Sequence, residues 1–349
     1  MGAGRRCPDG GEGRGIQGAQ SPLERSVVLV PERASPRLLG PASRTRTNFI
    51  ERLVVGAEFL TQHGGRDTMV SVERDQELQR QGEEYLLGYS DAEELRLKRQ
   101  AEELRQESAW LFDRTGLGLG DRAIDLGCGP QGALDLLSER VGSTGHVIGI
   151  ERNRDSVAMA RRFVADRGLK NVDVLLGDAT ATGLPRASFD LVHARLVLVN
   201  VPYVKAIVRE MVRLARPGGV LASYEADYLS HLCDPPLRAW DRLFEIFKGY
   251  SSANGIDLFV GRRTHRLFRE AGLVDIEVSP VIHVYPHGHS RRPVFWDFLQ
   301  NVRDRVLEQE LIGESEFDEL TAELKEHLDR PDTLVVSHLF FQVWGRKPV

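Results

Sequence analysis

The stretch Ala123-Ile124-Asp125-Leu126-Gly127-Cys128-Gly129-Pro130-Gln131-Gly132 decides the fold of this 349-residue chain. It starts as an apolar run typical of a buried strand, passes through one acidic residue and breaks into a glycine-rich turn. The glycines follow the G-x-G-x-x-G spacing, which lets the backbone turn tightly and lets a ligand approach where a side chain would collide. Apolar residues at helical spacing predict a helix over 133–141. The turn therefore lies at a helix N-terminus, where free N–H groups favour the polar groups of a nucleotide-bearing ligand.

Polar residues also stand at the ends of the next three apolar runs. The runs at 147–150, 172–176 and 189–194 end in Glu151, in Asp178-Ala179 and in Arg195. Open parallel sheets bind ligands beyond the carboxyl ends of their strands, and an acidic residue at the second strand can accept both hydroxyls of a ribose. A single exposed carboxylate can simply solvate a loop, but the pattern at successive strand ends predicts one ligand site.

These residues resemble the ordered motifs of class I S-adenosylmethionine-dependent methyltransferases, from roughly residue 85 to residue 278. The resemblance implies an α/β fold with a Rossmann-like, seven-stranded, mostly parallel sheet flanked by helices, and S-adenosylmethionine as the cofactor. It implies that Asp125, Gly127 and Gly129 form the cofactor turn. It further implies that Glu151 holds the ribose, that Asp178 and Ala179 meet the adenine, and that the strand end at Arg195 passes the methionine part.

Asp125 separates this chain from nicotinamide-dependent enzymes, which use similar glycines to seat a pyrophosphate. A carboxylate beside the turn suits a ligand with an ammonium group and would repel two phosphates. Asp178 adds an acceptor for an adenine N–H.

Composition changes along the chain and predicts its organisation. Residues 1–68 hold ten Arg and no Lys, with many Gly and Pro, and are expected to be a disordered extension; Met69 opens a more ordinary sequence and is an alternative start. We expect a helical lid over 69–120 and the methyltransferase domain over 121–349. Helical cap insertions are expected at about 227–259 and 282–332, where they would build the acceptor pocket.

The expected lid contains a capping box, Ser90 to Glu93, which predicts a helix through Phe112. Tyr85 precedes it in an element that resembles the one closing over the cofactor in small-molecule methyltransferases. On that resemblance Tyr85, Arg96 and Gln100 could meet the cofactor carboxylate. The alternative is that these polar side chains face water.

The remaining pattern predicts further strands at 220–224, 274–278 and 334–344 and helices at 201–215 and 262–271. Aromatic stripes at helical spacing, starting at Trp240 and at Phe295, predict one helix in each insertion. Such stripes are either core or substrate contacts.

Two residues are candidates for a general base. Glu225 lies just past the fifth predicted strand, and His283 belongs to a group with His287 and His289. The histidine spacing matches no zinc signature, so no metal is expected.

The composition excludes several classes of partner. The chain is 41% hydrophobic and 28% charged with a formal net charge of −5, which disfavours nucleic acid. No apolar run approaches the ~20 residues that span a bilayer, so no membrane partner is expected. Three scattered cysteines fit a reducing cytoplasm. We expect a small-molecule acceptor and a monomer or homodimer.

The function expected from the resemblance is transfer of a methyl group from S-adenosylmethionine to O, N or C of the acceptor by in-line displacement. Asn200 departs from the family pattern, because many relatives have the His of Leu-x-His there. A cofactor-assisted cyclase or isomerase, or a catalytically idle cofactor-binding subunit, therefore stays an alternative.

Overall fold

The computed structural model describes residues 27–28 and 91–349. The expected lid residue Tyr85 and the extension 1–68, apart from the pair 27–28, lie outside the described residues.

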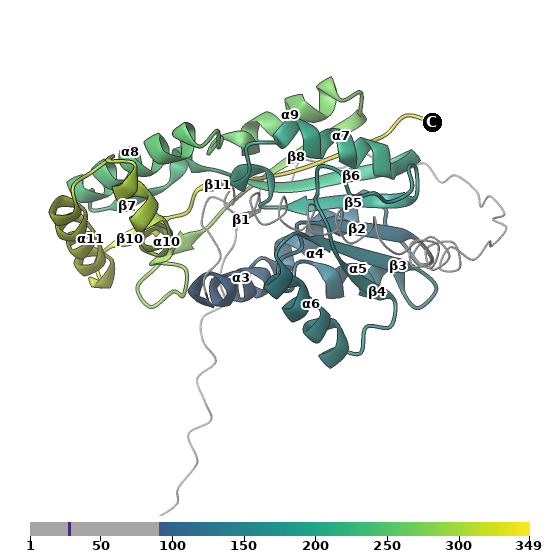
Figure 1. Cartoon of the computed structure of the whole chain (residues 1–349), viewed down its shortest axis with the longest axis horizontal. Helices are drawn as coiled ribbons and strands as arrows, with labels where there is room; N and C mark the ends of the chain where they lie inside the picture. The colour runs from purple at the N-terminus through teal and green to yellow at the C-terminus, as the bar shows by residue number, and fades with distance from the viewer. Residues whose placement is uncertain (1–26, 29–90) are drawn as a thin grey trace, which may run out of the picture.

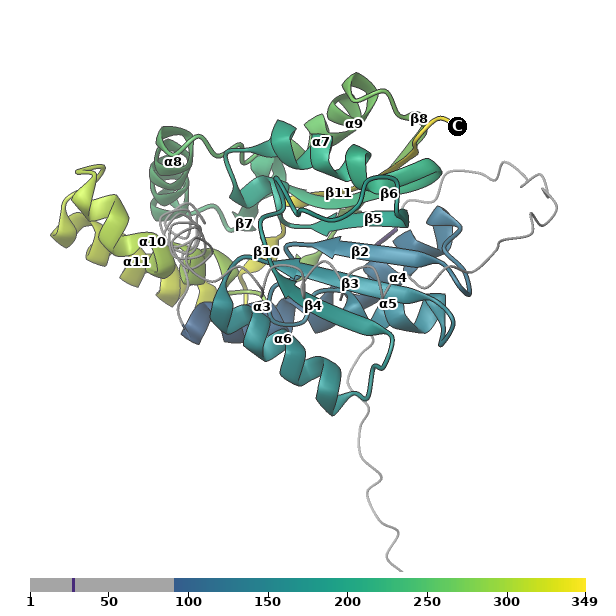
Figure 2. The same ribbon diagram turned by 45° about the vertical axis from the view of Figure 1, so that its right-hand side comes forward.

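The predicted seven-stranded sheet is present and has one short extra edge strand. Its order is β1-β8-β11-β6-β5-β2-β3-β4, and Figure 2 labels the strands from β8 to β4. The strands are β1 (Val27–Val28), β2 (Arg122–Leu126), β3 (His146–Glu151), β4 (Val172–Leu176), β5 (Phe189–Arg195), β6 (Ala215–Asp227), β8 (Val274–Ile282) and β11 (Leu339–Arg346). Strands β2 to β6 pair in parallel, whereas β11 is antiparallel to both of its neighbours.

The strand order places the ligand crevice. From β2 the chain moves outward through β3 to β4, then returns to β5 on the other side of β2 and continues to β6. Because such crossovers are right-handed, the helices of the two halves cover opposite faces of the sheet. The direction reverses between β2 and β5, and ligands bind in open α/β sheets at such a switch point.

The helices of the sheet domain are α5 (Leu134–Val141), α6 (Arg154–Asp166), α7 (Val204–Leu214) and α9 (Val260–Glu270). Helices α5, α7 and α9 form where the sequence predicts them, whereas α6 has no counterpart among the predicted helices. Helix α6 begins at Asn153, whose side chain accepts a hydrogen bond from the N–H of Ser156 at 2.8 Å. Helices α7 and α9 contact β6, while α5 and α6 contact β3.

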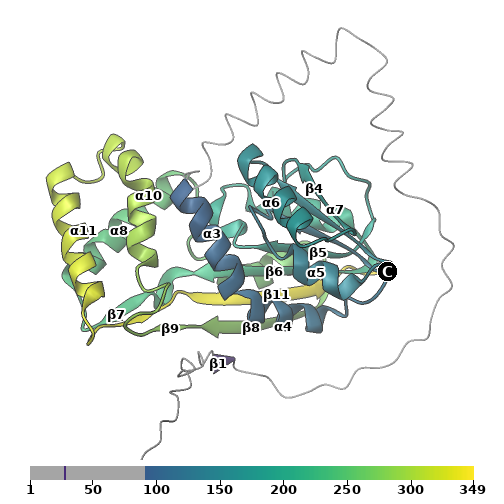
Figure 3. The same ribbon diagram turned by 90° about the horizontal axis from the view of Figure 1, so that it is seen from below.

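The two predicted insertions form a cap at one end of the sheet (Figures 1 and 3). The cap consists of α8 (Arg238–Ala253), α10 (Val294–Glu308), α11 (Glu314–Asp329) and a small sheet of β7 (Leu232–Asp234), β10 (Leu334–Val336) and β9 (Val284–Tyr285). Its helices pack through buried aromatic rings, with 4.8 Å between the centroids of Trp240 and Phe295. Most of the aromatic stripe is therefore core.

Two predicted elements are divided in the structure. The strand predicted over 334–344 becomes β10 in the small sheet and β11 in the main sheet. The helix predicted through Phe112 becomes α3 (Asp91–Glu103) and α4 (Arg105–Thr115), with Leu104 between them. Leu104 is fully buried, as are Leu111 and Phe112 on α4, so both helices are held by packing. No helix among the described residues is long and apolar enough to span a bilayer.

Candidate functional site

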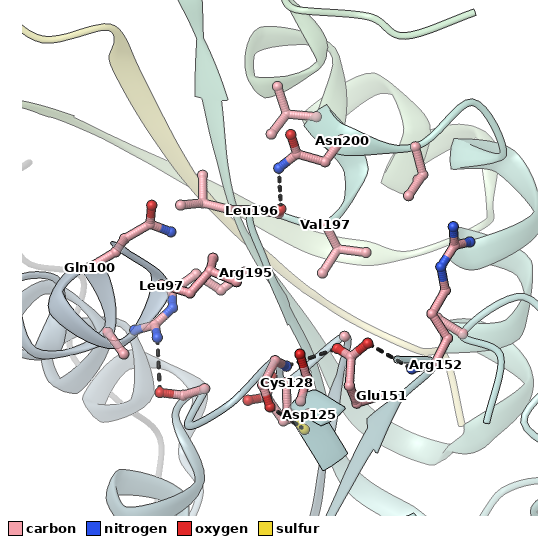
Figure 4. A pocket seen from close by; sticks show the side chains of 18 of the residues that line it. Leu97, Gln100, Asp125, Cys128, Glu151, Arg152, Arg195, Leu196, Val197 and Asn200 are labelled. Carbon is pink, nitrogen blue, oxygen red and sulfur yellow. Dashed lines mark hydrogen bonds between the residues drawn. The ribbon is translucent and has the colours of Figure 1, made fainter. Parts of the chain in front are cut away.

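One large cavity lies at the predicted switch point, with a volume of about 1300 Å³ including the solvent at its mouth. It is lined by glycine-turn residues, by the ends of β3, β4 and β5, by α3 and by residues of the cap. Eight residues predicted to bind the cofactor line it: Gln100, Asp125, Gly127, Gly129, Glu151, Asp178, Ala179 and Arg195. Figure 4 labels four of them around the cavity: Gln100, Asp125, Glu151 and Arg195. It also labels Asn200, which stands where many relatives have a histidine.

The glycine turn needs glycine for two different reasons. Gly127 has φ of +65°, and a Cβ there would lie 2.7 Å from Cγ2 of Val197. Gly129 has φ of +58°, but a Cβ there would meet no atom within 4 Å. The space in front of Gly129 belongs to the cavity, so a ligand can approach this part of the backbone closely.

Asp125 fixes the turn. Its Oδ1 lies 2.7 Å from Nδ1 of His193 on β5, and its Oδ2 accepts a hydrogen bond from the N–H of Ala133 at 3.0 Å. Burial alone would raise the pKa of this carboxyl, but its interaction with His193 and the Ala133 bond outweigh burial and lower the pKa. Asp125 is therefore ionised, and both oxygens are already engaged within the protein.

Glu151 joins the end of β3 to the turn. Its Oε2 accepts from the N–H of Gly129 at 2.9 Å, and its Oε1 accepts from Arg152 and Asn153 at 2.7 and 2.8 Å. Burial raises the pKa of this carboxyl above its ordinary value, against the effect of these bonds. The bonds hold Glu151 at the cavity wall in a defined position.

The neighbouring strand ends are held in similar ways. Oδ1 of Asp178 accepts two bonds from Thr180, from its N–H and its hydroxyl, both at 2.7 Å. Arg195 donates to Oγ of Ser108 at 2.8 Å and to the carbonyl of Gly132 at 2.9 Å, which ties α4 to the glycine turn.

Helix α3 closes the cavity on the side of the lid. Arg96 forms an ion pair with Glu93 at 2.6 Å and donates a hydrogen bond to Gln100 at 2.5 Å. Glu93 also accepts from Asn301 on α10 at 2.8 Å, so α3 is attached to the cap. Arg96 and Gln100 are buried at the cavity wall and do not face bulk water.

Neither predicted general base lines the cavity. Glu225 is fully buried, and its carboxylate accepts bonds from the N–H groups of Val197, Leu198 and Val199 at 3.1–3.2 Å. Burial raises the pKa of Glu225 to about 8. The prediction that Glu225 acts as a general base is therefore corrected. Its side chain is out of reach of a substrate in the cavity, because it holds the loop after β5.

His283 is also set back from the cavity. Its ring stacks on Tyr285, with 6.2 Å between centroids, and its Nε2 lies 3.7 Å from Oε1 of Glu107. Burial lowers the pKa of His283 to about 4. No group of three metal-ligating side chains occurs in the described part of the chain.

Sequence analysis expected the acceptor pocket in the two insertions but singled out none of the polar residues at the cap end of the cavity. Tyr228, Arg291, Phe298 and His338 line it there. His338 stands within the single strand predicted over 334–344, and Arg291 within an insertion without a motif. Neither position carries a signal that links it to the glycine turn.

The likeness to known proteins agrees with this geometry. A family model described as a methyltransferase domain matches residues 118–272. The demethylmenaquinone methyltransferase of Geobacillus kaustophilus (strain HTA426) is 30% identical over 197 residues, which cover 50% of this chain and 82% of that protein. The chain belongs to the class I S-adenosylmethionine-dependent methyltransferases.

Two further proteins are similar to parts of this methyltransferase. An uncharacterized 37.1 kDa protein in a transposon of Streptomyces fradiae is 33% identical over 188 residues, covering 52% of this chain and 51% of that protein. A solved phosphoethanolamine N-methyltransferase 2 from Haemonchus contortus is 21% identical with a TM-score of 0.46, covering 70% of this chain and 53% of that chain.

Proposed function

We propose that this methyltransferase transfers a methyl group from S-adenosylmethionine to a small acceptor bound between the sheet and the cap. The observation that supports this most is the meeting of eight predicted cofactor residues, from separate elements, at one cavity that continues into the cap. The lining of the cavity runs from the glycine turn to Tyr228 and Phe298 at the cap, so it offers one wall for a nucleoside-bearing cofactor and another for an acceptor.

The residues present fit the cofactor. The open space in front of Gly129 admits close approach to the turn, and Gly127 keeps the backbone in the conformation that shapes it. We assign the ribose hydroxyls to Glu151, whose Oε2 accepts only the Gly129 bond among the described residues and has one acceptor position left, and the adenine to Asp178 and Ala179. When bound, S-adenosylmethionine supplies an electrophilic methyl group on a sulfonium.

The methionine end is assigned to Arg195, Gln100 and Arg96, whose polar groups could bind the cofactor carboxylate. Tyr85 stays a prediction. Because both oxygens of Asp125 are engaged by His193 and Ala133, we propose that Asp125 acts by holding the turn and not by direct contact with an ammonium group.

The protein's main contribution to rate is positioning. Holding two reactants in the correct geometry can supply ~7–11 kcal/mol of the barrier. Helix α3, attached to α10 through Glu93 and Asn301, forms one wall of the cavity. The buried cysteines Cys128 and Cys233 are free thiols, which suits the reducing cytoplasm that we propose as its compartment.

The test is binding followed by turnover. We expect S-adenosylmethionine to bind the full chain in calorimetry and Glu151→Ala to weaken its affinity by roughly tenfold or more, because a carboxylate with charged hydrogen bonds is lost. Asp173→Ala, a change of a partly exposed carboxylate on β4 that does not line the cavity, is the matched control. Equal binding by wild type and Glu151→Ala would contradict the site assignment.

A further inference from the structure

The cap end of the cavity contains a cation and an imidazole that the cofactor assignment leaves unused. Arg291 is 6% exposed and His338 is 2% exposed, and both line the cavity. They also contact the same ring: His338 lies 4.4 Å from Phe340 between centroids, and Cζ of Arg291 lies 5.8 Å from the Phe340 centroid. The two polar groups therefore form one site.

Hydrogen-bonding capacity at this site is not used within the described part of the chain. Nη1 of Arg291 and Nδ1 of His338 are buried and have no hydrogen-bond partner there. The ion pair of Arg291 is long, 3.4 Å from Nε to Oε2 of Glu103. Burying such groups without partners costs free energy. Because both side chains line the cavity, a ligand oxygen there can accept from Arg291 and exchange a proton with His338.

The imidazole of His338 is in its neutral form at neutral pH. Burial lowers its pKa well below the ordinary value, and neighbouring groups from four parts of the structure act in the same direction. These groups are His231, Arg291, His283 and Arg96. A neutral imidazole retains a nitrogen lone pair that can accept a proton.

Aromatic side chains form part of the wall at this end of the cavity. Tyr228 and Phe298 line the cavity beside His338, and Tyr228 stacks on the imidazole with 4.7 Å between centroids and 19° between planes. Cζ of Arg96 lies 5.0 Å from the Phe298 centroid. A second, smaller cavity between α3 and α10 shares Arg96, Gln100 and Arg291 with the large one.

We propose that the acceptor is a planar molecule with an acidic hydroxyl, a phenol or enol, that His338 accepts the hydroxyl proton and that Arg291 stabilises the resulting oxyanion. The proposal rests on the proposed function above. The oxygen lone pair forms the new bond to the methyl carbon while the bond from that carbon to sulfur breaks. The products are a methyl ether and S-adenosylhomocysteine, and the proton on His338 passes to solvent. The general base is therefore His338 and not Glu225 or His283.

The test uses 4-nitrophenol as the probe, because its anion absorbs visible light and its neutral form does not. The full chain is saturated with S-adenosylhomocysteine and titrated with the probe over a range of pH. We expect saturable binding with the probe held as its anion, so that its apparent pKa falls on binding. His338→Gln and Arg291→Gln should weaken binding of the anion by roughly tenfold or more and move the apparent pKa back upward, while Arg291→Lys should restore part of the shift.

His231→Gln is the matched control, because His231 is also buried beside His338 but does not line the cavity. It should bind the probe as wild type does, and thermal unfolding identifies any variant that fails to fold. Absence of probe binding, binding of the neutral phenol, or equal losses in His231→Gln and His338→Gln would overturn the proposal. S-adenosylmethionine binding is measured on the same samples, so failure of the cofactor site is distinguished from failure of the acceptor site.

Discussion

At the scale of single residues, a substitution of Gly129 tests cofactor binding with little change in stability. Alanine at this position would keep a positive φ of +58°, which costs about 1–2 kcal/mol, but would meet no neighbouring atom. Its methyl group would stand in the space from which the cofactor approaches. We expect Gly129→Ala to abolish detectable S-adenosylmethionine binding in calorimetry while lowering stability by only about 1–2 kcal/mol.

Gly168 provides the control for this change. It also has a positive φ, +64°, a Cβ there would meet no atom within 4 Å, and it does not line the cavity. Gly168→Ala should lose similar stability and retain wild-type binding. If the two variants bind equally well, the turn is not the cofactor site.

The residues at the strand ends could be predicted because their chemistry is local to one turn. Glu151 and Asp178 follow apolar runs directly, and the structure places both at the cavity. The partner of Asp125 could not be predicted, because His193 is 68 positions away and meets it only when β2 and β5 pair. The same holds for His338 and Arg291, which reach the cavity through the cap.

At the scale of an element, Glu225 determines the shape of the loop after β5. Glu225→Gln would replace one carboxyl oxygen by an amide N–H₂ group facing backbone N–H donors, so we expect a loss of about 1–3 kcal/mol in unfolding free energy at about pH 6. Denaturant unfolding measures it. A fully stable variant with lost turnover would contradict this structural role and would support Glu225 as the general base.

The pH dependence of that loss has a definite sign. The pKa of Glu225 is raised by burial from its ordinary 4.5 to about 8 in the folded protein. The contribution of Glu225 to the free energy of unfolding is therefore complete below about pH 4.5 and is lost as pH rises through about 8. Between about pH 6 and about pH 9 wild type should lose stability relative to Glu225→Gln, which thermal unfolding at each pH measures.

Glu210 on α7 gives the opposite case. Burial would raise its pKa, but hydrogen bonds from Arg213 and Thr182 outweigh burial and lower it. The contribution of Glu210 to the free energy of unfolding is present above the ordinary pKa of a glutamate and is lost in acid. Wild type and Glu210→Gln should therefore keep a constant difference between about pH 6 and about pH 9, and a change parallel to that of Glu225→Gln would contradict the assignment of the alkaline effect to Glu225.

The elements themselves were predicted well where periodicity is sustained and poorly where tertiary pairing intervenes. The parallel strands and α7 follow from apolar runs and helical spacing. The strand predicted over 334–344 could not be divided from sequence, because its residues are β-branched or aromatic on both sides of Ser337-His338. Only the pairing of β10 with β7 and β9 separates it from β11.

At the scale of the whole molecule, the cap and the sheet share one continuous hydrophobic core among the described residues. Phe295 is fully buried in the cap and contacts Trp240, Phe244 and Phe247. We expect Phe295→Ala to cost about 3–5 kcal/mol and to lower the stability of the entire domain in one transition. Phe244→Ala, a change of a partly buried ring on α8, should cost less; a separate early transition of the cap would show that the cap folds independently.

The central claim is that the glycine turn and the strand ends bind S-adenosylmethionine and not a pyrophosphate cofactor. The most direct measurement is calorimetry of S-adenosylmethionine and NADH side by side on the full chain. We predict saturable binding of S-adenosylmethionine and none of NADH, since Asp125 places an ionised carboxylate beside the turn, where it would repel a pyrophosphate. Binding of NADH alone would contradict the account and make this a redox site.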